Sequence, residues 1–459
     1  MKRSTPALSA ALALTLALGV LSTAGTASAH DHPGADADTA RHGRYGTKTP
    51  YRPQGDPDRY QQPPRGFRPV FTENVARHGS RAMTGSEDGD AVLAVLAEAG
   101  RQDALTDLGT RLAPQVRSLL TAAATLGYGN LSALGAREHR QTALRLEQRL
   151  PSLFRTIVAD REPVVVETSG VPRAVASADA FTAGLTAGDP GLTGLIGAPV
   201  TEKDLLYFHK QPQNADYRAY LANDPDLAAV LARNEADPRT AEAARHALSR
   251  LFRADFVTAL PVDEQVSFAR SLYEVYSAAP DLAVEAPSVD LSRYLTAHDA
   301  RWLGYLDDAE EFYQKGPAFS GRTITYRMAG VLLDDLLAQA GARADGRNHN
   351  GAVLRFTHAE EIEPLAALMG LPGSTEGADP EQPYSYRNNP WRGAEVVPMA
   401  ANIQWDLYEN APSDGGPADH LVRMLYNEEE IAFKPSCRPI AEGSHYYRLD
   451  ELRRCLAHD

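Results

Sequence analysis

The sequence predicts an α/β protein in which a mostly parallel central sheet is flanked by helices and a helical region is inserted into the chain. Three observations support this fold class. Strand-like segments alternate with helical patterns in residues 67–187 and 315–459, which is typical of an α/β sheet. The span between them, 188–314, is the predicted insert, and from about 202 to 308 it is rich in Ala, Leu and charged residues at helical spacing. Two of the strands lead directly into a loop that contains His and is followed by a helix.

The first part of the predicted core contains two strands separated by helices. Residues 69–76 (PVFTENVA) form the first strand, and 163–168, with three consecutive Val, form the second. Helical patterns dominate from 91 to 154, and 174–185 is predicted as a further helix. A Gly-rich break at 188–199 leads into the helical insert.

The second part of the core returns to alternating strands and helices. We predict helices at 330–340 and 359–369, and strands at 351–357, 395–407 and 420–425. In open α/β sheets, ligands bind at the carboxyl ends of strands. The loops that follow the first strand and the strand 351–357 are therefore the candidate sites.

Residues 1–29 have the layout of a cleaved export signal. A positively charged start (MKR) is followed by an apolar run at 7–21 and by the small-residue cleavage site ASA at 27–29. A membrane anchor is the alternative, but the run is too short for a spanning helix. We therefore expect a secreted, extracellular protein without a membrane anchor. Residues 30–66 show no sustained period and predict an irregular lead-in.

Composition excludes some classes of function. The chain of 459 residues carries a net charge of −14, whereas nucleic-acid binders carry a basic surface, so we expect no nucleic-acid partner. An anionic substrate would need a local basic pocket. The two cysteines, Cys437 and Cys455, are expected to form a disulfide in an oxidising compartment, with two free thiols as the alternative.

The segment 77–81, RHGSR, carries chemistry suited to a phosphate ester. Arg77 and Arg81 offer planar forks of N–H groups that match phosphate oxygens. The imidazole of His78 could attack phosphorus and form a covalent intermediate, which splits one difficult displacement into two easier ones. Gly79 would let the backbone approach the ligand closely. This pattern predicts phosphoryl transfer, in which positioning and charge stabilisation dominate.

A second copy of the RHG string, at 41–44, shows that these letters alone decide little. It lies in the irregular lead-in, follows no apolar strand and has Tyr45 where the second Arg would stand. Structural context and not the string identifies a motif, so we interpret this copy as a solvated linker.

The loop after the strand 351–357 supplies the second candidate set, His358-Ala359-Glu360. Glu360 would begin a helix, donate a proton to the leaving oxygen and then activate water. Taken singly, His358 is more often a hydrogen-bonded structural histidine, and Glu360 a first-turn acid favoured by the helix dipole. Their occurrence together with 77–81 favours the catalytic interpretation.

RHGSR after a strand, with a distant HAE, resembles the histidine acid phosphatases, branch 2 of the histidine phosphatase superfamily. Within this family the chain is most similar to the multiple inositol polyphosphate phosphatases, which carry His-Ala-Glu where fungal and enteric phytases carry His-Asp. The resemblance covers most of the chain. Its further segments are TKTPY (47–51), PRAVASADAFTAGL (172–185), LRFTHAEEIEPLAALMGL (354–371), VVPMAANIQWDLYE (396–409) and VRMLYNEEEI (422–431).

The resemblance implies a role for each matching residue. His78 would be the nucleophile and Glu360 the proton donor, and the phosphate clamp would consist of Arg77, Arg81, Arg173 and His358. The implied histidine phosphatase fold is an α/β domain with a helical domain over the active site. The family motif usually has Pro two residues after the second Arg, where this chain has Met83. We expect altered loop packing or substrate contacts there.

Further basic residues are candidates for contacting the rest of a polyanionic substrate: Lys48, Lys210, Lys315, Arg387 and Arg392. Each of them is also readily explained as a solvated surface charge. We expect no metal ion and no cofactor. The segment HDH at 30–32 could chelate a metal weakly, but it belongs to the N-terminus of the mature chain.

We therefore interpret the chain as a secreted, monomeric and metal-independent inositol polyphosphate phosphatase with phytate as the expected substrate. A generalist acid phosphatase acting on sugar phosphates or other monoesters is the first alternative. A phosphate-ester binding protein without turnover is the alternative from another class, and the intact set of site residues argues against it. A phosphoglycerate mutase is more distant, because the chain is expected to be exported.

Overall fold

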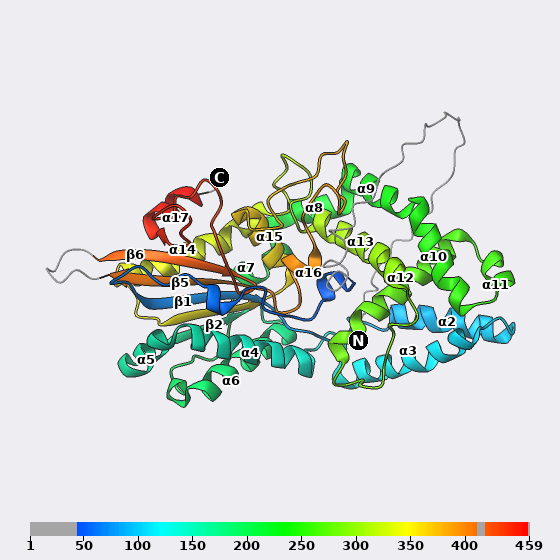
Figure 1. Cartoon of the computed structure of the whole chain (residues 1–459), viewed down its shortest axis with the longest axis horizontal. Coiled ribbons are helices and arrows are strands. Elements are labelled where there is room, and N and C mark those ends of the chain that lie inside the picture. The colour runs from blue at the N-terminus through cyan, green and yellow to red at the C-terminus, as the bar shows by residue number, and fades with distance from the viewer. Residues whose placement is uncertain (1–43, 411–417, 458–459) are drawn as a thin grey trace, which may run out of the picture.

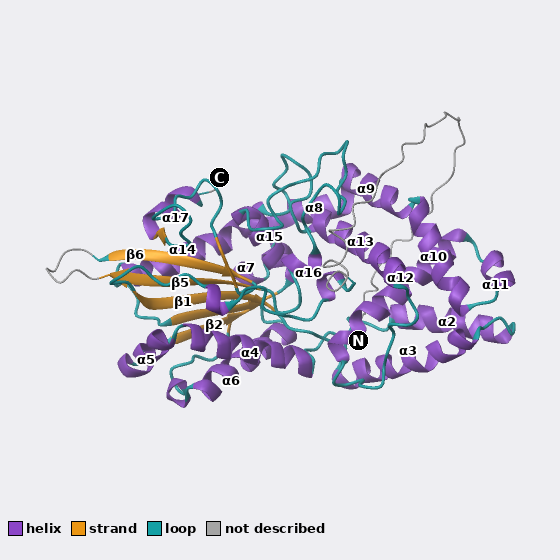
Figure 2. Ribbon diagram, viewed as in Figure 1, coloured by secondary structure: helices purple, strands orange, loops and turns teal. Residues whose placement is uncertain are grey.

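The structure, a computed structural model, describes residues 44–410 and 418–457 (Figure 1). The predicted export signal, the lead-in as far as residue 43 and the first three residues of the second RHG copy lie outside the described residues. A β-sheet with helices on both faces forms one part of the molecule, and a group of helices forms the other. The two parts lie end to end (Figure 2).

The central sheet has eight strands in the order β3-β2-β4-β1-β5-β6-β7, and β8 pairs with β6. The strands from β3 to β1 in this order are parallel neighbours, whereas the pairs from β1–β5 onward are antiparallel. The predicted α/β class is confirmed, but the sheet is mixed and not mostly parallel, because four of its seven described strand pairs are antiparallel; the parallel pairs surround β4. The strands are β1 (Arg68–Arg77), β2 (Val164–Thr168), β3 (Val200–Thr201), β4 (Ala352–Thr357), β5 (Asn402–Asn410), β6 (Asp419–Tyr426), β7 (Glu429–Ile431) and β8 (Tyr447–Arg448).

Most predicted strands begin and end within one residue of the observed ones, because a strand buried on both faces has a near-continuous apolar sequence. Every residue of β4 is buried, and β1 is buried from its third residue onward. The strand predicted at 395–407 is wrong in its first part. Residues Gly393–Val396 form the short helix α16, and β5 starts only at Asn402.

Helices cover both faces of the sheet. α4, α5 and α6 lie on one face, and α14, α15 and α17 lie on the other (Figure 1). Local sequence starts several of them: the Ser132 hydroxyl accepts the Gly135 N–H ahead of α4, and Pro151 and Pro172 begin α5 and α6. Their bounds are α4 (Ala133–Arg149), α5 (Pro151–Asp160), α6 (Pro172–Gly188), α14 (Gly330–Ala344), α15 (Ala359–Met369) and α17 (Leu449–Cys455).

The remaining long helices form the helical part, at the right of Figure 1. It contains α9 to α13, and also α2 and α3, which fall within the span 67–187 predicted as core but pack against α10 and α12. Conversely, β3 lies within the predicted insert and pairs with β2. The bounds are α2 (Glu87–Arg101), α3 (Asp107–Leu126), α9 (Pro225–Glu235), α10 (Pro238–Leu251), α11 (Ala254–Ala259), α12 (Val262–Ala278) and α13 (Ala297–Gln314).

Short helices connect these layers. The 3₁₀ turns are η1 (Gly46–Lys48), η2 (Pro57–Arg59), η3 (Pro190–Leu192), η4 (Phe208–Lys210), η5 (Pro212–Asn214), η6 (Ala279–Leu282) and η7 (Arg327–Ala329). The short α-helices are α7 (Lys203–Leu206), α8 (Ala215–Asn223) and α16 (Gly393–Val396). Within residues 44–410 and 418–457, no helix combines the length and the apolar character needed to cross a bilayer.

A charged cluster inside the sheet ties its central strands together. Arg355 on β4 is fully buried and pairs with Glu73 on β1 at 3.0 Å, Glu167 on β2 at 3.2 Å and Asp335 on α14 at 2.5 Å. A buried charge of this kind is stable only when its partners are in place. The cluster therefore fixes β1, β2 and β4 relative to one another.

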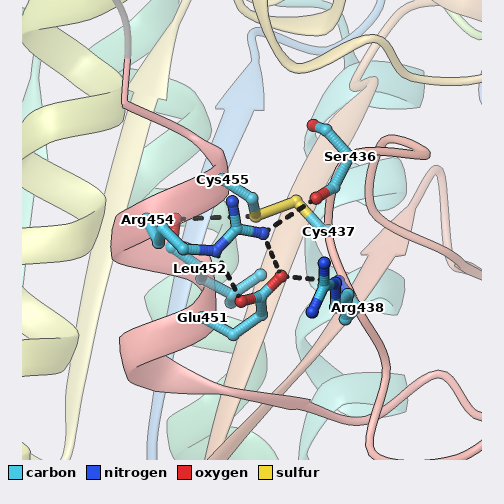
Figure 3. Close-up of a disulfide and its surroundings, with 7 residues drawn as sticks. All are labelled: Ser436, Cys437, Arg438, Glu451, Leu452, Arg454 and Cys455. Carbon is cyan, nitrogen blue, oxygen red and sulfur yellow. Dashed lines mark hydrogen bonds and ion pairs between the residues drawn. A yellow bond between two sulfur atoms is a disulfide. The ribbon is translucent and has the colours of Figure 1, made fainter.

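The predicted disulfide between Cys437 and Cys455 is present (Figure 3). It joins α17 to the segment that follows β7. Beside it, the Glu451 carboxylate pairs with Arg454 and accepts the backbone N–H of Arg438 at 2.7 Å. The C-terminal helix is thus fastened by one covalent bond and by polar contacts next to it.

Candidate active site

The ends of β1 and β4 bring the two predicted histidine loops together. The strands are parallel neighbours, and the backbone N–H of His78 donates to the carbonyl oxygen of Thr357 at 2.9 Å. The rings of His78 and His358 lie 5.5 Å apart between centroids, in an edge-on arrangement. Two motifs far apart in the sequence therefore share one site at the carboxyl edge of the parallel strands, as predicted.

His78 is buried and arranged as a neutral nucleophile. Its Nδ1 lies 2.9 Å from the Gly79 carbonyl oxygen, and because a carbonyl only accepts, Nδ1 carries the proton. Nε2 then keeps its lone pair. Burial, followed by the charge of Arg77 and the proximity of His358, lowers the pKa of His78 well below its usual value. The imidazole is therefore unprotonated when a substrate arrives.

Residues 77–81, called the phosphate loop below, are held by an acid on α4. The Glu138 carboxylate accepts the backbone N–H of Ser80 at 2.8 Å, the Ser80 hydroxyl at 2.8 Å and the backbone N–H of Tyr51 at 2.9 Å. Sequence reasoning missed Glu138. Its signal in the sequence is weak, because the face that α4 buries also contains the polar residues His139 and Thr142.

Asp281, in η6 of the helical part, also lies beside the phosphate loop and was missed. It is 1% exposed, and burial, together with the nearby Glu138 carboxylate, raises the pKa of Asp281 to about 8. The side chain is therefore neutral near pH 7. Asp281 connects the helical part to the loop, and nothing in the local sequence APDL indicates that role.

Three arginines surround His78. Arg77 donates to the carbonyl oxygens of Thr47 and Val397, both at 2.5 Å, which fixes its guanidinium. The Nε atoms of Arg77, Arg81 and Arg173 are buried without a hydrogen-bond partner among the described residues. Burial and then the charges of Arg173 and Arg77 lower the pKa of Arg81 to about 10. The cluster concentrates positive charge with unused donors, which suits a phosphate dianion.

His358 is the residue before α15 and is 1% exposed. Its Nε2 lies 2.8 Å from the Ser169 hydroxyl oxygen, and its Nδ1 is buried without a partner in the part of the chain that the structure describes. Burial, and next the charge of Arg173, lowers the pKa of His358 to about 3. His358 therefore contributes a neutral hydrogen-bonding group to the clamp rather than a positive charge.

Glu360 lies in the first turn of α15, half-buried beside the clamp. Lys315 Nζ is 3.4 Å from its Oε1. Burial alone would raise the pKa of the Glu360 carboxyl, but Lys315, His209 and His358 outweigh burial and hold this pKa well below its usual range. In the free protein Glu360 is therefore a carboxylate, able to accept a proton or to activate water.

The five additional basic residues do not form one group. Lys48 pairs with Glu274 at 2.9 Å and Asp307 at 3.6 Å, and Lys315 pairs with acids as well. Arg392 donates to the carbonyl oxygens of Tyr386, Asn389 and Trp391 and stacks on the Tyr386 ring, which is a structural role.

The other two basic residues, Lys210 and Arg387, are exposed. Lys210 follows His209 in η4, close to the site, because Tyr207 in the preceding turn lies against the His358 ring at 5.3 Å. Of the five predicted residues, Lys210 therefore combines exposure with a position next to the clamp.

Met83, which replaces the usual motif Pro, is 8% exposed and packs into the hydrophobic core. Its carbonyl oxygen accepts the backbone N–H of Gly129 at 2.7 Å. The departure thus concerns the packing of the loop that follows Arg81. In residues 44–410 and 418–457, no three His, Cys, Asp or Glu side chains converge in a way that could hold a metal ion.

The site and the fold match known proteins. Residues 71–427 match the family model described as "Histidine phosphatase superfamily (branch 2)". The chain is 26% identical over 427 residues to multiple inositol polyphosphate phosphatase 1 of Gallus gallus, covering 85% of this chain and 84% of that protein.

Solved structures show the same likeness. The crystal structure of a multiple inositol polyphosphate phosphatase of Bifidobacterium longum in complex with inositol hexasulfate is 32% identical, with a TM-score of 0.83. The match covers 90% of this chain and 97% of that one. The phytase of D. castellii, 15% identical with a TM-score of 0.62, covers 90% and 84% and shares the fold.

Proposed function

Because this chain belongs to branch 2 of the histidine phosphatase superfamily, we propose that it is an exported inositol polyphosphate phosphatase that acts through a phosphohistidine on His78. The family makes it a phosphatase. The observation that carries the mechanism is a neutral, buried His78 surrounded by three arginines whose Nε donors have no partner in the described chain. Such a site attracts a phosphate dianion and presents a nucleophile to it.

In the first step, Nε2 of His78 attacks phosphorus while the bond from phosphorus to the ester oxygen breaks. Arg77, Arg81 and Arg173 stabilise the charge on the three non-bridging oxygens. Glu360 gives a proton to the leaving oxygen, so that an alcohol departs and not an alkoxide.

In the second step, water replaces the histidine on phosphorus. The Glu360 carboxylate left by the first step takes a proton from this water, and the phosphohistidine bond breaks to give inorganic phosphate and free His78. When this proton leaves with the phosphate, Glu360 returns to its ionised form. A ring that carries several phosphates would lose them one at a time.

Inositol polyphosphates are the proposed substrates for two reasons. The Bifidobacterium longum enzyme, 32% identical over nearly its whole length, was solved with inositol hexasulfate bound. The proton-donor segment also has His358-Ala359-Glu360, the form that resembles the inositol polyphosphate phosphatases. Lys210, exposed next to the clamp, is a candidate contact for a second phosphate on the ring.

The test is phosphate release by the purified mature protein from phytate and from a panel of sugar phosphates at equal concentration. We expect the highest kcat/KM on phytate. A higher value on sugar phosphates would favour the generalist acid phosphatase. Binding of phytate without any phosphate release would support a binding protein instead.

Export is proposed from the N-terminal segment alone, residues 1–29. Expression of the full chain in a host with a working secretory pathway should give activity in the medium and a mature N-terminus near His30. Full-length protein retained inside the cell would contradict export without bearing on the phosphatase chemistry.

A further inference from the structure

Lys315 joins the end of the helical part to the first turn of α15. It is the residue immediately after α13, and its side chain is 16% exposed. Its Nζ lies 2.7 Å from an Oε of Glu311, one turn earlier on α13, and 3.4 Å from Oε1 of Glu360 on α15. A cation predicted to contact substrate thus lies between two carboxylates.

A third acid completes this group. Glu363 is one turn after Glu360 on the same helix, is fully buried, and has both carboxyl oxygens without a hydrogen-bond partner in the described residues. Burial, reinforced by Glu311, raises the pKa of Glu363 well above its usual value, whereas Glu311 and Glu360 each pair directly with Lys315. Lys315 therefore balances two negative charges, and one of them is the proton donor of the proposed reaction.

The Lys315 ammonium is suited to this position. Burial would lower its pKa, but Glu311 and Glu360 outweigh burial and raise the pKa of Lys315 well above its usual value. A point charge with three donors can hold two carboxylates at once, and a substrate phosphate would have to compete with both.

We propose that Lys315 is a positioning residue that holds the Glu360 carboxylate at the clamp in its ionised form. The proton for the leaving group must then be brought by the substrate. This inference rests on the proposed function. The second pKa of a phosphate monoester is about 6, so below that pH the ester carries one proton. A monoprotonated ester would bring that proton into the site, where Glu360 is the available base.

The proton balance then closes without any other reactant. The P–O–H proton of the bound ester moves to a Glu360 oxygen, which leaves the phosphoryl group fully ionised in the arginine clamp. Attack by His78 breaks the bond to the ester oxygen, and that oxygen takes the proton from Glu360. Glu360 is again a carboxylate paired with Lys315; it takes a proton from the attacking water and passes it to the departing phosphate, so the site returns to its starting state.

Several other titratable groups face Glu360 and stay unchanged in the tests below. They are Arg81 and Arg173 in the clamp, His358, Glu361 on α15, His209 and Tyr207 around η4, and Tyr217 on α8. His209 is itself held by Glu361, 2.5 Å from its Nδ1. A difference between variants at Lys315 therefore reports Lys315 and not this common background.

The first test compares Lys315→Met with the wild type on glycerol phosphate, a poor leaving group, and on para-nitrophenyl phosphate, which needs no proton. We expect kcat on glycerol phosphate to fall by about tenfold or more, a part of the 10²–10⁴-fold that general acid catalysis supplies. The aryl ester should lose far less. An equal loss on both esters would overturn the proposal.

The pH profile gives the second readout. Without the Lys315 charge, Glu360 binds a proton more readily, so the decline of kcat/KM at acid pH should begin about 1–3 pH units higher than in the wild type. Lys315→Arg should restore both the profile and the ester ratio. The control Lys434→Met removes a lysine beside Gly370, at the opposite end of α15, and should change neither.

Glu311→Gln keeps the proposal testable if Lys315→Met does not fold. It removes the competing carboxylate, so that Lys315 pairs with Glu360 alone. The decline of kcat/KM at acid pH should then not move to higher pH, and the ratio of rates on the two esters should be retained. An upward movement would refute the assignment. If His78→Ala still turns over either ester, the proposed function is wrong. If His78 is essential but Lys315→Met behaves like the wild type, only the inference about Lys315 is wrong.

Discussion

Replacing Gly79 with Ala tests whether the placement of the phosphate loop limits the reaction. A Cβ at Gly79 would lie 2.6 Å from the carbonyl oxygen of Gly135 and 2.7 Å from its Cα, in the first turn of α4. Both are backbone atoms, and ordinary van der Waals contact begins at 3.4 Å. The loop and the start of α4 must therefore separate by about 0.8 Å.

This displacement also moves the nucleophile. His78 directly precedes Gly79, and its Nδ1 is hydrogen-bonded to the Gly79 carbonyl at 2.9 Å, so the nucleophile moves with the loop. A misplacement of about 1 Å costs on the order of 100-fold in rate, so kcat on an aryl phosphate should fall by roughly 30–100-fold. Overpacking should also lower the free energy of unfolding by about 1–3 kcal/mol.

The assay is kcat on para-nitrophenyl phosphate at a temperature where thermal melting shows the variant folded. Gly100→Ala is the matched control, because its Cβ would meet only Leu105 Cδ1, at 3.6 Å, inside α2. That variant should keep its rate and be stabilised by a few tenths of a kcal/mol to about 1 kcal/mol. A folded Gly79→Ala enzyme with kcat within about threefold of wild type would refute the reasoning.

Four further outcomes are expected. The native protein holds a proton on Asp281 up to about pH 8 that the unfolded chain releases near its usual value of 3.8, so this group makes stability fall with rising pH. Asp281→Asn removes this group, so its free energy of unfolding in urea should fall less steeply between pH 3.8 and about 8, by up to ~1.4 kcal/mol per pH unit. The same pH dependence in the variant and the wild type would refute the protonated state of Asp281. Replacing Cys437 and Cys455 by Ser, which opens a loop with a sequence separation of 18, should lower the free energy of unfolding by about 3 kcal/mol, checked by denaturant titration. Arg355→Met leaves the buried Glu73 and the partly exposed Glu167 and Asp335 without their cation. It should cost about 3–5 kcal/mol in the same titration, and a neutral result would show that Glu73 is protonated. Chelators should leave kcat unchanged, because the proposed nucleophile is a histidine and arginines stabilise the charge; loss of activity in EDTA that is restored by metal would contradict this.

The sequence predicted the elements that carry the nucleophile and the proton donor almost residue by residue. β4 and α15 were predictable because an apolar run and a helical period meet at His358, and because burial on both faces leaves a strong pattern. The sequence of an amphipathic helix does not show which part of the molecule its apolar face packs against. α2 and α3 have an amphipathic face that would suit the sheet, yet they pack against α10 and α12.

The site shows the same division. Arg77, Arg81 and His358 follow from motifs at strand ends, and Arg173 from the family resemblance. Glu138, Asp281 and the Glu311–Lys315–Glu360 group depend instead on contacts between distant elements. Lys315 illustrates the difference. Its positive charge suggested a contact with substrate phosphate, but in the structure it pairs with the carboxylates of Glu311 and Glu360. Charge pairing across elements is a property of the packed chain, and no local period encodes it.

The central claim is that phosphate passes through His78. It is tested most directly by mixing the enzyme with radiolabelled phytate, quenching within one turnover and measuring label bound to the protein. We expect label that is lost in acid and stable in alkali, as for a phosphorus–nitrogen bond, and no bound label in His78→Ala. Acid-stable label, or label of either kind in His78→Ala, would contradict the account.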